Sequence, residues 1–200
     1  MATQTESVIT PERYNTGISY AEWMAKIDRN QDKFEQNYND VKLNPDDVAA
    51  IKALVEKAGG PAKCCAIGEP WCPDVFRGLP VMAKLAEATG MDIKIFFRDE
   101  NVDMINEYLY KGEFQSIPVF VFYTKDHQYL GHWTEKSQKT RDEAPIMGAI
   151  TSKMRNAELT EAERAAAMEE YAAFQAGPVW DGWRQAEVTE IRELLEGATK

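Results

Sequence analysis

The chain has 200 residues, a hydrophobic content of 44% and a formal net charge of −10. This length suits one domain with extensions and is ample for a hydrophobic core. The excess of acidic residues argues against a nucleic-acid partner, which needs clustered lysine and arginine, and no apolar run approaches the ~20 residues that span a bilayer.

The cysteine count and the first residues both bear on the compartment. Three cysteines are an odd number, which fits a reducing cytoplasm better than a disulfide framework. Residues 1–7 contain neither a basic segment nor an apolar one, so we expect no secretion signal. The sequence therefore predicts a cytoplasmic protein without a membrane partner.

The N-terminal part is predicted to be an arm followed by helices. Residues 1–17 lack apolar periodicity, and we expect a flexible arm there. Ser19 and Glu22 then form a capping-box pattern at the start of a helical apolar repeat. A second helix opens at Asn44, which is followed by proline and two acidic residues. Residues 18–59 are thus expected to form a helical extension.

Strands and helices alternate through the middle of the chain. Two predicted helices cover about 74–89 and 101–110. The predicted strands lie near 63–67, 91–97, 117–123 and 129–134. The short turn between the last two strands implies an antiparallel hairpin. We expect an α/β fold with a mixed sheet of about four strands flanked by helices.

From about residue 141 the chain is predicted to be helical. The apolar residues there recur at helical spacing, and Thr160 with Glu163 forms another capping-box pattern. Such apolar stripes need a surface to cover them. Residues 141–200 are therefore expected to pack on the central α/β part.

One segment between a predicted strand and a predicted helix suggests thiol chemistry: Glu69-Pro70-Trp71-Cys72-Pro73-Asp74-Val75. A cysteine at a helix N-terminus meets unpaired N–H groups that favour its thiolate, which is the nucleophile of disulfide exchange. The carboxylate of Asp74 opposes this effect and raises the thiol pKa. We expect the helix to outweigh the carboxylate. The alternative is a cysteine that packs as a small hydrophobic residue.

Over residues 60–140 the chain resembles the thioredoxin family. Trp71-Cys72 matches the start of that family's Trp-Cys-x-x-Cys motif, and Pro80 matches the proline within its active-site helix. Ile117-Pro118 matches its cis-proline loop, and the segment from Asp126 to Trp133 matches its terminal hairpin. The four features occur in the family's order and at fitting intervals.

The resemblance implies a catalytic role for Cys72 and a cis peptide bond between Ile117 and Pro118, although a trans proline at the start of a strand stays an alternative. It also implies that the substrate contacts the residues around that thiol, namely Trp71, Pro73, Asp74, Ile117 and Pro118.

Two departures limit what the resemblance carries over. Val75 stands where the family has its second, resolving cysteine, and the family's buried acid falls near Cys65 or Ala66. Cys64 and Cys65 are too far along an extended strand to bridge to Cys72, so we expect core cysteines. A dithiol thioredoxin is therefore not expected.

The leading prediction is an atypical monothiol thioredoxin-like protein, in which an external low-molecular-weight thiol such as glutathione resolves the mixed disulfide. The alternatives are a non-catalytic peptide- or protein-binding module and a glutathione-transferase-like enzyme, whose layout fits poorly. The expected partners are protein or small-molecule disulfides. Cysteine and histidine spacing predicts no metal or other cofactor. Aromatic residues outside the core either dock the flanking helices or form a homodimer contact.

Overall fold

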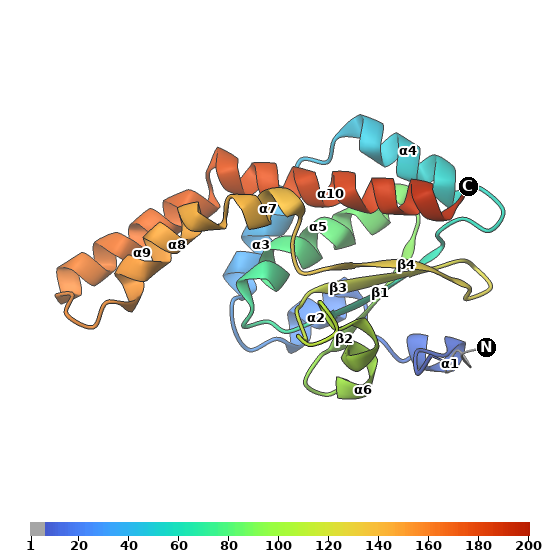
Figure 1. Ribbon diagram of the computed structural model, residues 1–200, viewed down its shortest axis with the longest axis horizontal. Coiled ribbons are helices and arrows are strands. Elements are labelled where there is room, and N and C mark those ends of the chain that lie inside the picture. Colours follow the sequence, from blue (N-terminus) through green and yellow to red (C-terminus); the bar gives the residue numbers. More distant parts are fainter. Residues whose placement is uncertain (1–6) are drawn as a thin grey trace.

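Four strands form one mixed sheet in the order β2-β1-β3-β4 (Figure 1). The computed structural model describes residues 7–200. In it, β1 pairs in parallel with β2 and antiparallel with β3, which pairs antiparallel with β4. The strands are Lys63–Gly68 (β1), Asp92–Phe97 (β2), Val119–Tyr123 (β3) and Tyr129–Thr134 (β4). The predicted α/β class and strand number are confirmed.

Helices flank both faces of this sheet (Figure 1). The central strand β3 is buried along its whole length, which is why its sequence is continuously apolar. The helices are α1 (Pro11–Tyr14), α2 (Tyr20–Lys26), α3 (Gln31–Asp40), α4 (Pro45–Val55), α5 (Pro73–Thr89), α6 (Val102–Ile105), the 3₁₀ turn η1 (Asn106–Tyr108), α7 (Gln138–Asp142), α8 (Ala144–Arg155), α9 (Glu161–Gln175) and α10 (Pro178–Ala198). None of those within residues 7–200 is long and apolar enough to cross a membrane.

The segment before α2 is not the flexible arm that we expected. Residues 1–6 lie outside the described part, but residues 7–17 pack against the sheet, with Ile9 and Tyr14 buried. The Tyr14 hydroxyl donates to the backbone oxygen of Asp92 at 3.0 Å. Ile18 then pairs with Ile95 through two backbone hydrogen bonds of 3.0 and 2.8 Å. The expectation was wrong because tertiary burial orders a segment that has no periodicity of its own.

The apolar repeat after Ser19 forms two helices instead of one. The Ser19–Glu22 capping box is present, but α2 ends at Lys26 and α3 starts at Gln31. Asn30 precedes α3 with a φ of 57°, a left-handed conformation that asparagine tolerates better than most residues. The amide of Gln31 donates to the carbonyl of Ile27 and so satisfies part of the preceding helix end.

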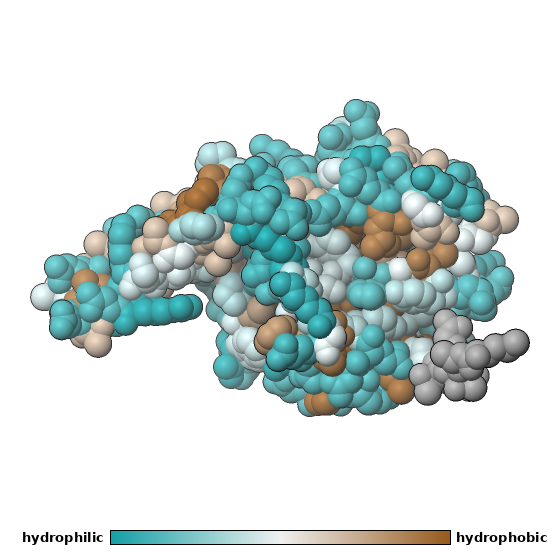
Figure 2. Space-filling model, in the orientation of Figure 1, coloured by the Kyte–Doolittle hydropathy of each residue, from teal (hydrophilic) through white to brown (hydrophobic). Residues whose placement is uncertain are grey.

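The C-terminal helices pack on the core only in part. Helix α10 lies along α4, α5 and β4 and buries five residues completely: Trp180, Trp183, Val188, Ile191 and Leu195. Helices α8 and α9 instead form a hairpin that projects from the core (Figure 1), held by a 2.8 Å ion pair between Lys153 and Glu170. Figure 2 shows the hairpin standing clear, with a mixed polar and apolar surface. The packing prediction is therefore wrong for most of α8 and α9, although Phe174 near the end of α9 packs edge-on against Trp180 and Trp183.

Candidate functional site

Cys72 lies at the N-cap of α5, directly after the loop that follows β1. Pro73 occupies the first helical position, where its fixed φ suits a helix start and its missing N–H costs nothing. Val75 and Phe76 both donate backbone hydrogen bonds to the Cys72 carbonyl at 3.1 Å. Local sequence thus places the thiol at the N-terminal end of α5, as predicted, with Pro80 inside the same helix.

The loop that carries Trp71 and Cys72 is fastened on two sides. The side-chain amide of Asn30 donates to the Pro70 carbonyl at 2.8 Å. On the other side the Glu69 carboxylate, which is buried, accepts from the backbone N–H of Asp99 at 2.8 Å. Trp71 itself is 44% exposed. Sequence reasoning gave no role to Asn30 or Glu69, and both tie the loop to neighbouring segments by hydrogen bonds.

The backbone around Pro118 lies against the thiol. The Ile117–Pro118 peptide bond is cis, as predicted. The Cys72 thiol donates to the Ile117 carbonyl, with 3.7 Å between sulfur and oxygen. Cys72 is half-buried, whereas Ile117 is buried. The structure therefore brings together the two segments that the resemblance placed at the site.

The pKa of the Cys72 thiol is raised, contrary to our expectation. Burial is the main cause, and the carboxylate of Asp74 adds to it. The N–H groups of Val75 and Asp74 and the guanidinium of Arg77 act in the opposite direction but do not compensate. Helix placement was expected to decide this pKa, and desolvation outweighs it. The thiol is therefore protonated at neutral pH.

Asp74 does not face solvent freely. Its carboxylate is 2.8 Å from the Arg77 guanidinium and 3.1 Å from the Lys136 ammonium. Lys136 also pairs with Glu135 at 3.0 Å. These cations compensate the charge of Asp74, so the acidic residue beside Cys72 belongs to an ion-pair cluster at the helix start.

The other two cysteines belong to the core. Cys64 and Cys65 lie within β1, are buried and are not disulfide-bonded. Burial raises the pKa of both thiols. Position 75, where the family has its resolving cysteine, holds a buried valine. Among residues 7–200, no group of three or more histidine, cysteine and acidic side chains lies together as a metal site would require.

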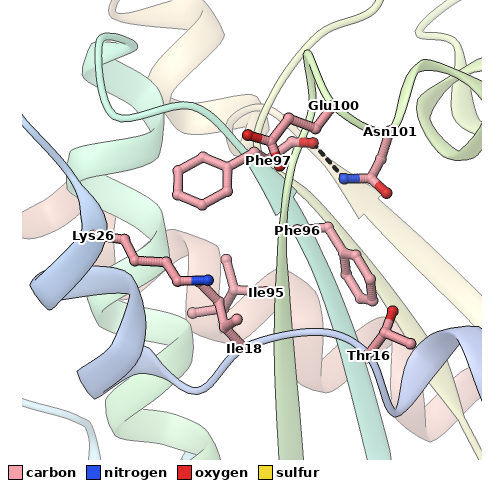
Figure 3. Close-up of a pocket in the computed structure, with 8 residues that line it drawn as sticks. All are labelled: Thr16, Ile18, Lys26, Ile95, Phe96, Phe97, Glu100 and Asn101. Atoms are coloured by element: carbon pink, nitrogen blue, oxygen red, sulfur yellow. Dashed lines mark hydrogen bonds between the residues drawn. The ribbon is translucent and has the colours of Figure 1, made fainter.

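A surface cavity of about 520 Å³ lies at the β2 edge of the sheet, away from Cys72 (Figure 3). It lies between Lys26 of α2 and the segment after β2, where the Asn101 amide donates to the Phe97 carbonyl at 2.8 Å. The candidate site does not include this cavity, because none of its lining residues contributes to the surroundings of the thiol.

Sequence reasoning missed a buried polar cluster behind Cys72. Arg77 of α5 and Glu187 of α10 are each only 1% exposed. Glu187 stands inside the apolar stripe of α10, and Gly78 interrupts the middle of α5. Those two irregularities were the available signal, because charged residues and glycine seldom occupy such positions without a packing reason.

Comparison with known proteins supports the family resemblance. A family model described as thioredoxin matches residues 17–171. No curated protein matches the sequence. A crystal structure of PA1234, a protein of unknown function from Pseudomonas aeruginosa, is similar with a TM-score of 0.64, 16% identity, and coverage of 92% of this chain and 95% of that one.

A second structure, an HIV epitope scaffold, is similar with a TM-score of 0.63 and 16% identity, covering 96% of this chain and 99% of that one. At this identity the two structures are evidence for the fold alone. The family model covers most of the chain, including the strand, loop and helix that hold Cys72, so the chain belongs to the thioredoxin family.

Proposed function

We propose that the protein carries out thiol–disulfide exchange through the single thiol of Cys72. The observation that carries the proposal is the placement of a half-buried thiol at the N-terminus of α5, 3.7 Å from the carbonyl that precedes the cis proline. There the thiol can approach a disulfide lying along the loop of Ile117 and Pro118. Trp71, Pro73 and Asp74 would border the same approach.

The exchange needs two steps because Val75 supplies no second sulfur. The Cys72 thiolate attacks one sulfur of a disulfide, a Cys72–substrate bond forms, and the leaving thiolate takes up a proton. An external thiolate, such as that of glutathione, then attacks the substrate sulfur of this mixed disulfide. That step releases Cys72 as a thiolate and leaves the substrate joined to the external thiol. The raised thiol pKa predicts that the first step is slow at pH 7 and accelerates in alkaline solution.

Incubation with oxidised glutathione, followed by intact-protein mass spectrometry, tests the proposal. We expect one glutathione per chain, located at Cys72, with a rate that rises between pH 7 and pH 10. The matched control is Cys72→Ser, since Cys64 and Cys65 are buried and should not react. Failure of the wild-type protein to form the adduct at any pH at which it remains folded refutes the proposal.

A second candidate is a binding module that holds a partner on the surface beside Pro118 without redox turnover. The raised pKa of Cys72 and the valine at position 75 favour it. The two candidates differ in what Cys72→Ser does. Loss of disulfide exchange with the variant indicates catalysis, whereas a partner captured equally by wild type and variant indicates binding alone.

The substrates that we propose are protein or small-molecule disulfides in a reducing cytoplasm. The odd number of cysteines is the observation that supports the proposed compartment. No resident cofactor takes part in the exchange. A homodimer contact remains a proposal, and sedimentation of the purified protein tests it.

A further inference from the structure

A buried arginine connects the start of α5 to the C-terminal helix. The Arg77 guanidinium lies 5.3 Å from the ring centre of Trp180 and 5.6 Å from that of Trp183. Its ion pair with Asp74 at 2.8 Å is close, but the N–H bonds are not aligned as in a hydrogen bond. None of the three guanidinium nitrogens donates a hydrogen bond to a group within residues 7–200, so the contact with Asp74 is purely an ion pair.

The Glu187 carboxyl fills a space that exists because residue 78 is glycine. A β-carbon at Gly78 would lie 2.9 Å from one carboxylate oxygen of Glu187 and 3.1 Å from the other. Glycine inside a helix costs about 1 kcal/mol relative to alanine, and here it leaves the space that the carboxyl fills. Neither oxygen of Glu187 accepts a hydrogen bond from any group within residues 7–200. The carboxyl is thus buried without a direct partner.

The charged groups around Glu187 are those that surround Cys72. Arg77 and Asp74 face it from α5, and Arg184 and Glu190 act on it from its own helix. Lys136, on the segment between β4 and α7, reaches the same cluster through Asp74. Tyr171 of α9 lies close enough to interact with Asp74, Arg77 and Cys72.

We propose that Glu187 is a positioning residue for Cys72. When Glu187 ionises, it withdraws the charge of Arg77 from the Cys72 thiolate. Within residues 7–200, Asp74 is the carboxylate that pairs with Arg77, whereas Glu135 pairs with Lys136 and Arg141. Ionisation of Glu187 adds a second carboxylate charge that acts on Arg77 and so disfavours an anion at Cys72. The inference deepens the proposed exchange function, since it specifies what sets the fraction of reactive thiolate.

The Glu187 carboxyl loses its proton in the pH range in which the Cys72 thiol is tested. The pKa of Glu187 is raised to about 8, mainly by burial and in part by Asp74 and Glu190, against the opposing effects of Arg77 and Arg184. The carboxyl is therefore neutral at pH 7 and ionised at pH 9. Burial also raises the pKa of the Cys72 thiol, and Arg77 acts on both groups, so the proposal predicts that each titration depends on the state of the other group.

The size of the effect follows from the spacing along α5. Gly78, which touches the carboxyl, stands six residues beyond Cys72, or about 9 Å along the helix axis. At that separation, and at an effective dielectric constant of about 20 to 40, one charge changes an ionisation constant by about five- to twentyfold. That is the shift to be measured.

The test is the pH dependence of Cys72 alkylation by iodoacetamide, measured by mass spectrometry between pH 6 and pH 11. We expect Glu187→Gln to lower the midpoint by about 0.7 to 1.4 pH units and to speed the reaction at pH 9 about five- to twentyfold. Glu187→Asp, which restores a titratable group, should return the profile towards that of the wild type. The matched control is Glu193→Gln, which removes an exposed charge from the same helix and should change nothing.

A second measurement does not depend on any variant. Carbon-13 NMR of the wild-type protein labelled at the glutamate carboxyls should show one carboxyl titrating near pH 8. If no glutamate titrates above pH 6, the proposal is overturned, and an unchanged alkylation midpoint in Glu187→Gln overturns it as well. Alkylation reports the thiol pKa whether or not disulfides react. A lowered midpoint without glutathione adduct would therefore uphold this inference and refute the exchange function.

Discussion

Restoring a second sulfur at position 75 should convert the site into a dithiol. In a helical turn the Cα atoms of residues i and i+3 lie about 5 Å apart, which is within the range that a disulfide spans. The two backbone bonds that close the turn onto the Cys72 carbonyl indicate that positions 72 and 75 keep this spacing. Val75→Cys should therefore form a reversible disulfide with Cys72.

The substitution should cost little stability. Val75 is completely buried and packs against Gly68, where a β-carbon would lie 2.9 Å from a Val75 methyl. Cysteine replaces two methyl groups by one sulfur, so the reduced variant should lose about 1 kcal/mol of unfolding free energy. Val75→Ser is the matched control, because it removes the same methyl groups without adding a thiol.

The assay is the reduction of insulin by dithiothreitol. The wild-type protein should accelerate it little, since each mixed disulfide waits for an external thiol. In Val75→Cys a neighbouring thiol resolves that intermediate, and we expect at least a tenfold gain, roughly the advantage of even a modest intramolecular step. The gain should be larger at pH 8.5 than at pH 7, because the Cys72 pKa is raised. A folded Val75→Cys protein that works no faster than Val75→Ser would refute this account of the site.

Three further outcomes follow from the packing. The folded state holds a proton on Glu187 up to about pH 8, whereas the usual pKa is 4.5, so the stability that this proton contributes is complete below pH 4.5 and is lost as the pH rises to 8. Glu187→Gln should flatten this pH dependence of the unfolding free energy, measured by urea unfolding at pH 5, 7 and 9. Equal pH slopes for wild type and variant would contradict this prediction. Gly78→Ala should lower the unfolding free energy by about 1–3 kcal/mol despite better helix propensity, and the loss should shrink in a Glu187→Ala background, as a double-mutant cycle would measure. Tyr14→Ala should cost about 3 kcal/mol in urea unfolding, whereas a change below 0.5 kcal/mol would mean that the first helix adds no stability.

Local sequence rules were enough for the parts of the site that depend on neighbours in the chain. The strand before Cys72 and the helix after it were predicted from residues within a few positions, whereas the cis bond at Pro118 was predicted from the family resemblance. The capping pair of Thr160 and Glu163 was likewise visible in the sequence and is present.

The protonation state of the thiol could not be predicted in this way. Burial determines the Cys72 pKa, and burial depends on segments far apart in the chain, including Ile117. The same limit applies to Arg77 and Glu187, which lie 110 positions apart and meet only when α10 packs on α5. It also applies to the first residues, where Tyr14 is held by β2 and not by any local repeat.

The pairing of Ile18 with Ile95 covers part of the exposed edge of the sheet. Strand β2 ends the sheet on one side, and an open strand of this kind offers unpaired N–H and C=O groups to any extended chain that meets it. The segment before α2 engages those groups at Ile95 from within the same molecule. The N–H and C=O of Ile95 are thus already paired within the molecule and are not open to an added strand.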